Sequence, residues 1–195
     1  MFESLKRKFQ LKFKDRTYAA SILAAALEDL LAKEEEEERR KESKNDGDKS
    51  NNLVVLGIPR GGVIVADIVA TKLKASKFDI VIPGKLRIPH NEEAAFGAIM
   101  GDGTVYLEDR IVRDLDISEE YIEKEKHLQM LEIQRRFALY RKQELQQQPL
   151  ESKTNKNTIT ILVDDGAASG ATVIAAAIHS LVKYDTNQLM KKYFF

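Results

Sequence analysis

Two short apolar runs limit most strongly what this chain can fold into, because each is followed by a glycine-containing loop and a helical pattern. The first run is Leu53 to Leu56, followed by a helix expected over Val63 to Lys74. The second is Thr158 to Val163, β-branched and bounded by turn residues, followed by a helix expected over Ala171 to Lys183. Runs of this kind are typical of parallel strands covered on both faces. A further strand is predicted over Phe78 to Ile82. The sequence therefore predicts an α/β fold, a mostly parallel sheet with helices on both faces and a ligand at the carboxyl ends of its strands.

The remaining elements are predicted from helix caps and turn residues. Asp15 is a candidate N-cap for a helix from Arg16 to about Glu42, and Ser118 caps a long charged helix ending near Lys142. The segment from Lys85 to Gly103 is interpreted as a long irregular loop, and Thr104 to Leu107 as a short strand. The side chains expected to face the core are Tyr18, Ile22, Leu23, Ala26, Leu27, Leu30 and Leu31 in the first helix and Ile122, Leu128, Leu131 and Phe137 in the charged helix.

The domain organisation predicted is a single domain over residues 1–195 that carries one charged insert. Between Lys33 and Ser50, 14 of 18 residues are charged, and turn residues follow at 45–48. We interpret residues 33–51 as a helix fraying into a solvated, disordered linker. Residues 146–157 are interpreted as a second linker, and 191–195 as at most a stub of a strand.

Composition excludes several classes of function. The 31 basic residues balance the 31 acidic ones, so no overall field favours nucleic acid or an anionic membrane. There is no cysteine, and the three histidines, at positions 90, 127 and 179, lack the spacing of metal ligands. No apolar run approaches the roughly 20 residues of a membrane span, and no signal peptide is recognisable. The sequence is that expected of a soluble, cytoplasmic protein.

The loop from Asp164 to Thr172 has the residue types of a phosphate site. Gly166 and Gly170 permit backbone angles closed to other residues, and the alanines between them leave room for a ligand. Backbone amides there can converge on a phosphate at a helix N-terminus, where the helix dipole adds about half a positive charge. Ser169 and Thr172 add hydroxyl donors.

Two neighbouring carboxylates, Asp164 and Asp165, cannot serve that phosphate, because like charges repel. Vicinal ribose hydroxyls are natural donors to a pair of carboxylates. The loop is therefore interpreted as a clamp for a ribose 5-phosphate. The simpler alternative is an acidic strand end followed by an ordinary turn of small residues. A P-loop and a dinucleotide fingerprint are both excluded by the spacing of the glycines and the absence of the P-loop lysine.

At these residues the sequence resembles the type I phosphoribosyltransferases, whose signature is a hydrophobic strand, two acids and a loop of glycine, alanine and threonine. The segment Gly57-Ile58-Pro59-Arg60-Gly61-Gly62 is similar to that family's pyrophosphate loop. Four further segments resemble one branch of predicted, uncharacterised phosphoribosyltransferases: Lys85 to Pro89, Asn91 to Glu93, Gly97 to Ile99 and the helix ending near Arg141. The resemblance extends from about Asp15 to Leu181, apart from the charged insert.

The resemblance implies a Mg²⁺-dependent transferase of nucleotide metabolism, which moves a phosphoribosyl group from phosphoribosyl pyrophosphate to a small nitrogenous acceptor. Asp164 and Asp165 would hold the ribose hydroxyls and stabilise positive charge at the anomeric carbon. The Mg²⁺ ion would be held mostly by the ligand itself. The residues implied to bind the 5-phosphate are Gly166, Ala167, Ala168, Ser169, Gly170, Ala171 and Thr172. Those implied to neutralise pyrophosphate are Arg60, Gly61, Lys85 and Arg87, with the loop 85–103 closing over the site.

Several alternatives stay open at this point. Arg60, Lys85 and Arg87 also fit solvated surface positions, and Glu92, Glu93 and His90 fit an ordinary loop better than acid–base roles. The branch generally has an arginine where this chain has Gly84, which removes one candidate pyrophosphate contact. A non-catalytic module that binds phosphoribosyl pyrophosphate or a nucleotide is the main alternative function, and a hydrolase of phosphorylated sugars is a third. With at most a stub of a strand at 191–195, the strand Ile159 to Val163 would be an exposed sheet edge, and this edge and the long charged helix leave room for a homodimer.

Overall fold

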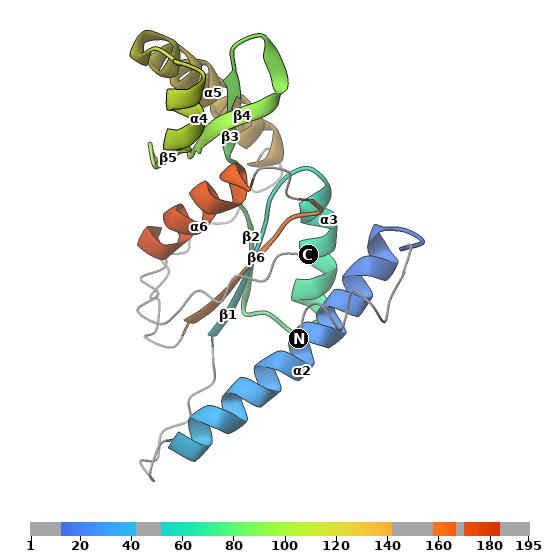
Figure 1. Cartoon of the computed structure of the whole chain (residues 1–195). Helices are drawn as coiled ribbons and strands as arrows, with labels where there is room; N and C mark the ends of the chain where they lie inside the picture. The colour runs from blue at the N-terminus through green and yellow to red at the C-terminus, as the bar shows by residue number, and fades with distance from the viewer. Residues whose placement is uncertain (1–12, 42–51, 142–157, 167–169, 184–195) are drawn as a thin grey trace.

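A computed structural model of the chain describes residues 13–41, 52–141, 158–166 and 170–183, and within them it shows two three-stranded sheets (Figure 1). The first sheet is parallel, in the order β2-β1-β6, and the second is antiparallel, in the order β3-β4-β5. The elements are α2 (Arg16–Lys41), β1 (Asn52–Gly57), α3 (Gly61–Lys72), β2 (Lys77–Ile80), β3 (Gly84–Ile88), β4 (Asn91–Ile99), β5 (Val105–Leu107), α4 (Asp109–Asp114), α5 (Glu119–Arg141), β6 (Thr158–Val163) and α6 (Ala171–Lys183).

The parallel sheet confirms the α/β prediction and has helices on both faces. Val55 faces a core shared with α2 and α3, whereas Val54 and Leu56 face a core shared with α6. All three side chains are buried because successive residues of a strand point to opposite faces, and both faces are covered. Strand β6 forms one edge of this sheet within the described residues. The predicted linker 146–157 and strand stub 191–195 lie outside them.

Helix α2 begins where the sequence predicts. The Tyr18 amide donates to Asp15 Oδ1 over 2.8 Å, so Asp15 is the cap. The buried face of α2 packs against α3. Its residues recur at helical spacing: Ala20, Leu23, Ala24 and Leu27. The prediction that Tyr18, Ile22 and Ala26 face inward is wrong, since all three are exposed. Residues 33–41, assigned to the disordered insert, are also helical in the structure, and 42–51 lie outside the described residues.

The expected irregular loop from Lys85 to Gly103 is instead the hairpin of β3 and β4, and this is the main correction to the predicted fold. The turn between the strands contains His90, at a positive φ of 63°. Leu86 and Phe96 are fully buried in a core shared with α4 and α5. Strand β4 lacks regular polar–apolar alternation because it is buried continuously from Ala95, with α6 packed against it, whereas the short strand β3 does alternate.

Helix α5 begins after Ser118, whose Oγ accepts from the Tyr121 amide over 3.3 Å, as predicted. Its buried face, however, carries Glu125, Gln129 and Ile133 rather than the predicted leucines. The Glu125 carboxylate accepts from the Arg87 amide over 3.3 Å and from Gln129 Nε2 over 3.0 Å, which satisfies the buried polar groups. The predicted core residues Leu128, Leu131 and Phe137 are each about half exposed, and Ile122 is partly buried.

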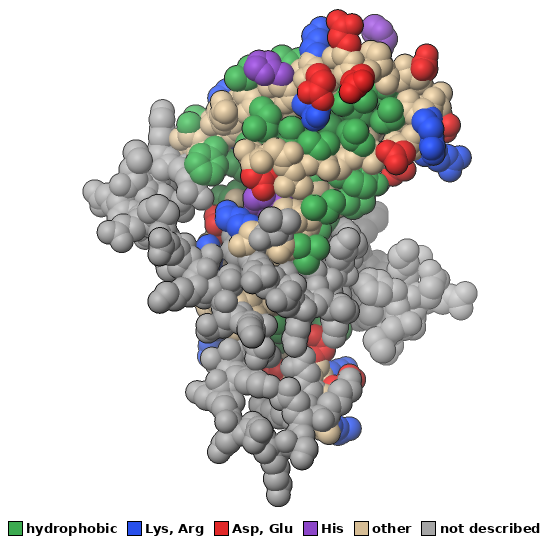
Figure 2. Space-filling view, turned by 90° about the vertical axis from the view of Figure 1, so that its left-hand side faces the viewer, with side chains coloured by type: hydrophobic (Ala, Val, Ile, Leu, Met, Phe, Trp, Pro, Cys, Tyr) green, Lys and Arg blue, Asp and Glu red, His purple; other side chains and the backbone are tan. Residues whose placement is uncertain are grey.

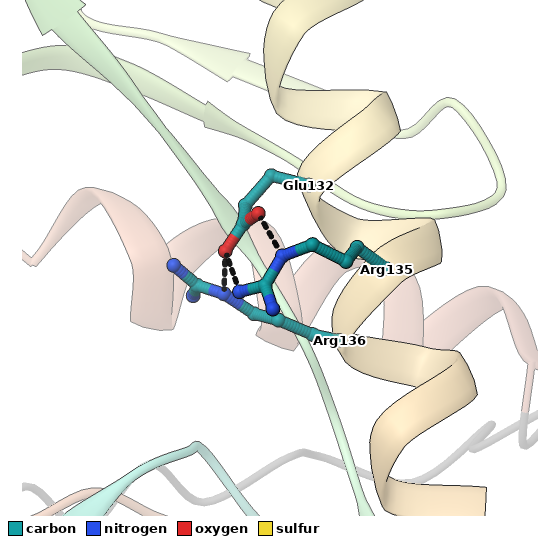
Figure 3. Close-up of polar contacts among 3 residues, drawn as sticks. All are labelled: Glu132, Arg135 and Arg136. Atoms are coloured by element: carbon teal, nitrogen blue, oxygen red, sulfur yellow. Dashed lines mark hydrogen bonds and ion pairs between the residues drawn. The ribbon is translucent and has the colours of Figure 1, made fainter.

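The outer surface of the second sheet mixes apolar and charged side chains. On the face seen in Figure 2, hydrophobic side chains gather over the upper part of the molecule, where β3–β5, α4 and α5 lie. Figure 3 shows Glu132 of α5 held by Arg135 and Arg136, each donating over 2.7 Å. These two donors lower the pKa of Glu132 to about 2.

Of the helices described, none combines the length and apolar character needed to cross a bilayer.

Replacing Gly84 with alanine is expected to destabilise the packing of α5 on β3. A Cβ on this buried glycine would lie 2.8 Å from Gln129 Cβ and 3.1 Å from the side chains of Ile133 and Ile99. Overpacking of this kind costs about 1–3 kcal/mol, measurable as a lower urea midpoint. Gly101→Ala is the matched control, since its Cβ would meet only Ile133, at 3.3 Å. Equal midpoints for the two variants would contradict the prediction.

Candidate functional site

Two loops begin side by side at the carboxyl edge of the parallel sheet. Strands β1 and β6 pair in parallel, with Gly57 opposite Val163 at the end of the register. The amide of Ile58 then donates to the Val163 carbonyl over 2.9 Å, extending the pairing by one residue. The segment 57–62 and the segment 164–172 therefore leave neighbouring strand ends. Ligands of open α/β sheets bind at this edge.

Two glycines at the start of α3 bring these loops into direct contact. A Cβ on Gly61 would lie 1.7 Å from Asp165 Oδ2, far closer than atoms can approach. A Cβ on Gly62 would lie 2.8 Å from the Asp164 Cα and 2.9 Å from the Val163 carbonyl oxygen. Only glycine at both positions permits this approach. The two aspartates are thereby held against the N-terminus of α3, where the helix dipole favours negative charge.

The Asp164 carboxylate is partly buried and is held by the backbone of its own turn. Its Oδ1 accepts from the Asp165 amide over 2.8 Å. Burial raises the pKa of Asp164, and the charge of neighbouring Asp165 adds to the rise, while bonds from the amides of Asp165 and Gly166 oppose it. A carboxylate in this setting is a ready acceptor for a hydroxyl donor, because each new hydrogen bond offsets part of its desolvation.

Asp165 is paired with Arg16, a residue that sequence reasoning missed. The Arg16 Nε and one terminal nitrogen donate to Asp165 Oδ2 over 2.9 and 2.8 Å. The two residues are 149 positions apart, so no local pattern could have indicated the contact. Arg16 is also the first residue of α2, where the helix dipole disfavours a cation. Its position is therefore explained by the contact with Asp165 and not by the stability of its own helix.

The predicted phosphate loop leads into a helix at the expected residue. Helix α6 begins at Ala171, and the Ile174 amide donates to the Gly170 carbonyl over 2.9 Å, which makes Gly170 the capping residue. Gly170 has a φ of +76°, the left-handed region that favours glycine. Gly166 is exposed and Thr172 is partly buried. Ala167, Ala168 and Ser169 lie outside the described residues.

The four predicted pyrophosphate residues do not share one environment. Arg60 is exposed and lies directly before Gly61, the residue that contacts Asp165. Lys85 instead donates to the Glu93 carbonyl within the second sheet. The Arg87 backbone is joined to α5, through its amide to Glu125 and through its carbonyl to the Tyr121 hydroxyl at 3.2 Å. The described contacts thus place Gly61 at the carboxylate pair, with Arg60 directly before it in the chain, whereas those of Lys85 and Arg87 lie within the β3–β4 hairpin and on α5.

The residues that the sequence suggests only weakly as acids, bases or metal ligands lie outside the two loops. Glu92, Glu93 and His90 are exposed at the tip of the β3–β4 hairpin. His179 Nδ1 lies 2.7 Å from Asp102 Oδ2 and joins α6 to the turn before β5. Within the described residues there is no group of three or more histidine, aspartate or glutamate side chains that could hold a metal ion. That a bound ligand holds Mg²⁺ stays a prediction.

Comparison with known proteins identifies relatives of this chain. No protein-family model matches it. Over 124 residues, 64% of the chain, it is 40% identical to two curated proteins of Mycobacterium tuberculosis, "Putative phosphoribosyl transferase MT0597" of strain CDC 1551 / Oshkosh and "Putative phosphoribosyl transferase Rv0571c" of strain H37Rv. The match spans about a quarter, 26%, of the length of each. The crystal structure of TT1426 from Thermus thermophilus superposes with a TM-score of 0.60 at 31% identity, covering 89% of this chain and 70% of TT1426.

Proposed function

Because this chain belongs to an uncharacterised family of phosphoribosyltransferase-like proteins, we propose that it transfers a phosphoribosyl group from phosphoribosyl pyrophosphate to a small nitrogenous acceptor. In this reaction the bond between the anomeric carbon and the pyrophosphate oxygen breaks. A bond from the same carbon to the acceptor nitrogen forms, pyrophosphate leaves, and the proton of the acceptor nitrogen passes to solvent.

The observation that carries the proposal is the contact of Gly61 and Gly62 with Asp164 and Asp165. It joins a glycine loop suited to an anion with a carboxylate pair suited to vicinal hydroxyls. A ligand that satisfies both must carry hydroxyls and anionic groups on one small frame. Phosphoribosyl pyrophosphate has ribose hydroxyls between two anionic ends.

We assign the ribose hydroxyls, the 5-phosphate and the pyrophosphate of this ligand to three different sets of residues. Asp164 and Asp165 accept the ribose hydroxyls and, as carboxylates, stabilise positive charge that develops at the anomeric carbon. The loop that ends at Gly170 and the first turn of α6 receive the 5-phosphate at a helix N-terminus. Gly61, which contacts Asp165, and the preceding residue Arg60 receive the pyrophosphate. Mg²⁺ would be held mainly by the ligand's own oxygens and would neutralise the leaving group.

The first test is calorimetric titration of the full 195-residue chain with phosphoribosyl pyrophosphate, with and without Mg²⁺. Saturable binding that strengthens with Mg²⁺ is expected. A second assay then follows pyrophosphate release while nucleobases and amines are added as acceptors. Release that depends on one acceptor supports the transferase. Binding without release identifies the non-catalytic module, release without an acceptor identifies a hydrolase, and a folded chain that does not bind contradicts the proposed site.

A further inference from the structure

We propose that Arg16, the first residue of α2, is a pyrophosphate-binding residue of this site. The inference rests on the proposed function and adds to it a residue from a third segment of the chain. Its starting point is the contact of Arg16 with Asp165, which places a guanidinium at the proposed ribose-binding carboxylate. Arg16 thereby adds a second guanidinium, in addition to that of Arg60, to the carboxylates and backbone amides that the two loops contribute.

The geometry of the pair leaves the guanidinium with donors to spare. Both contacts, from Nε and from one terminal nitrogen, end on the same oxygen, Oδ2 of Asp165. A guanidinium has five N–H donors, so the other terminal nitrogen is available to a second acceptor. Within the described part of the chain, Asp165 is the one side chain to which Arg16 donates, and the Arg16 side chain is 59% exposed. Arg16 can therefore bind an anion from solvent without releasing Asp165.

The neighbourhood of the guanidinium selects the pyrophosphate rather than the 5-phosphate. Arg16 Nε lies 2.9 Å from the position that a Cβ on Gly61 would occupy, so it adjoins the loop proposed for pyrophosphate. The 5-phosphate is assigned to the start of α6, after the 164–170 turn. Asp165 contacts Arg16 and Gly61, and in sequence it precedes the start of α6. A planar guanidinium suits the paired oxygens of a phosphate better than an ammonium does.

The expected effect of Arg16→Gln is selective for the ligand that carries pyrophosphate. In calorimetric titrations with Mg²⁺, its affinity for phosphoribosyl pyrophosphate should fall about tenfold or more, which is the usual weight of a charge-assisted hydrogen bond. Its affinity for ribose 5-phosphate should stay within about twofold of the wild-type value. Arg16→Lys keeps the charge but not the planar donors, and it should recover part of the loss.

Arg40→Gln is the matched control, because Arg40 lies on the same helix and pairs with Glu36 over 2.6 Å in a similarly exposed position. It should bind both ligands like the wild type, and circular dichroism should show the same helix content in all variants. Unchanged affinity of Arg16→Gln for phosphoribosyl pyrophosphate would overturn the inference. So would an equal change for both ligands, in either direction, because Arg16 would then act only through Asp165. A wild-type chain that binds neither ligand would contradict the proposed function itself.

Discussion

The double variant Asp164→Asn with Asp165→Asn is expected to lose phosphoribosyl pyrophosphate binding by at least about 100-fold. Each carboxylate supplies a charge-assisted hydrogen bond to a ribose hydroxyl, worth about 1.5–3 kcal/mol, so the pair contributes about 3–6 kcal/mol. An asparagine amide also presents an NH₂ group where the hydroxyl needs an acceptor. Removal of Asp165 additionally releases Arg16, which donates to it in the structure.

The same variant should remain folded. Burial raises the pKa of Asp164, so the folded state binds its proton more tightly than the unfolded state does. Ionised Asp164 therefore costs stability above its folded pKa, and the neutral asparagine removes that cost. The Arg16–Asp165 ion pair is exposed and contributes at most about 1 kcal/mol. Thermal unfolding should consequently show a midpoint close to that of the wild type.

The control for this experiment is Asp109→Asn with Asp114→Asn, which makes the same change of net charge on α4. Its affinity for phosphoribosyl pyrophosphate should equal that of the wild type. If the Asp164/Asp165 variant also bound with unchanged affinity while folded, the assignment of these aspartates to the ribose would be wrong. If both double variants lost binding equally, the effect would belong to the overall charge.

Gly61→Ala is expected to weaken phosphoribosyl pyrophosphate binding by about 10- to 100-fold. The new Cβ would lie 1.7 Å from Asp165 Oδ2 and 2.3 Å from its Cγ, so the aspartate or the start of α3 must move. Either movement separates the glycine loop from the carboxylate pair. Misplacement of a binding group by about 1 Å typically costs a factor of this size. Stability should change little, because the atoms that the new Cβ meets belong to the exposed side chains of Asp165 and Arg16, which can move.

A double-mutant cycle separates this clash from a general loss of structure. In an Asp165→Ala background the carboxylate that the new Cβ meets is absent, so Gly61→Ala should cost little further affinity or stability. Gly101→Ala, which meets only Ile133 at 3.3 Å, controls for the change from glycine to alanine and should bind normally. Additive effects of Gly61→Ala and Asp165→Ala would show that the two residues act independently, against the arrangement described above.

The chain's local patterns were sufficient for the elements that carry the site. Continuous apolar runs predict β1 and β6, because a strand buried on both faces needs apolar residues at every position. Cap residues predict the start of α2 at Arg16 and of α5 after Ser118. The small residues after Asp165 likewise place the start of α6 at Ala171. Each of these signals depends on residues within a few positions of one another.

Tertiary structure alone decided the β3–β4 hairpin, the inward face of α5 and the environment of Asp165. Lys85 and Arg87 alternate with Leu86 and Ile88, but this five-residue segment forms a strand because β4 supplies hydrogen-bonding partners and α5 covers the hairpin. Glu125 and Gln129 can be buried because the Arg87 amide bonds to Glu125 and Gln129 bonds to the same carboxylate. Arg16 meets Asp165 only once α2 packs on α3 and α3 follows β1 beside β6. Local sequence patterns report how a segment partitions between water and a core, whereas pairs that are distant in sequence are selected by the packing of whole elements.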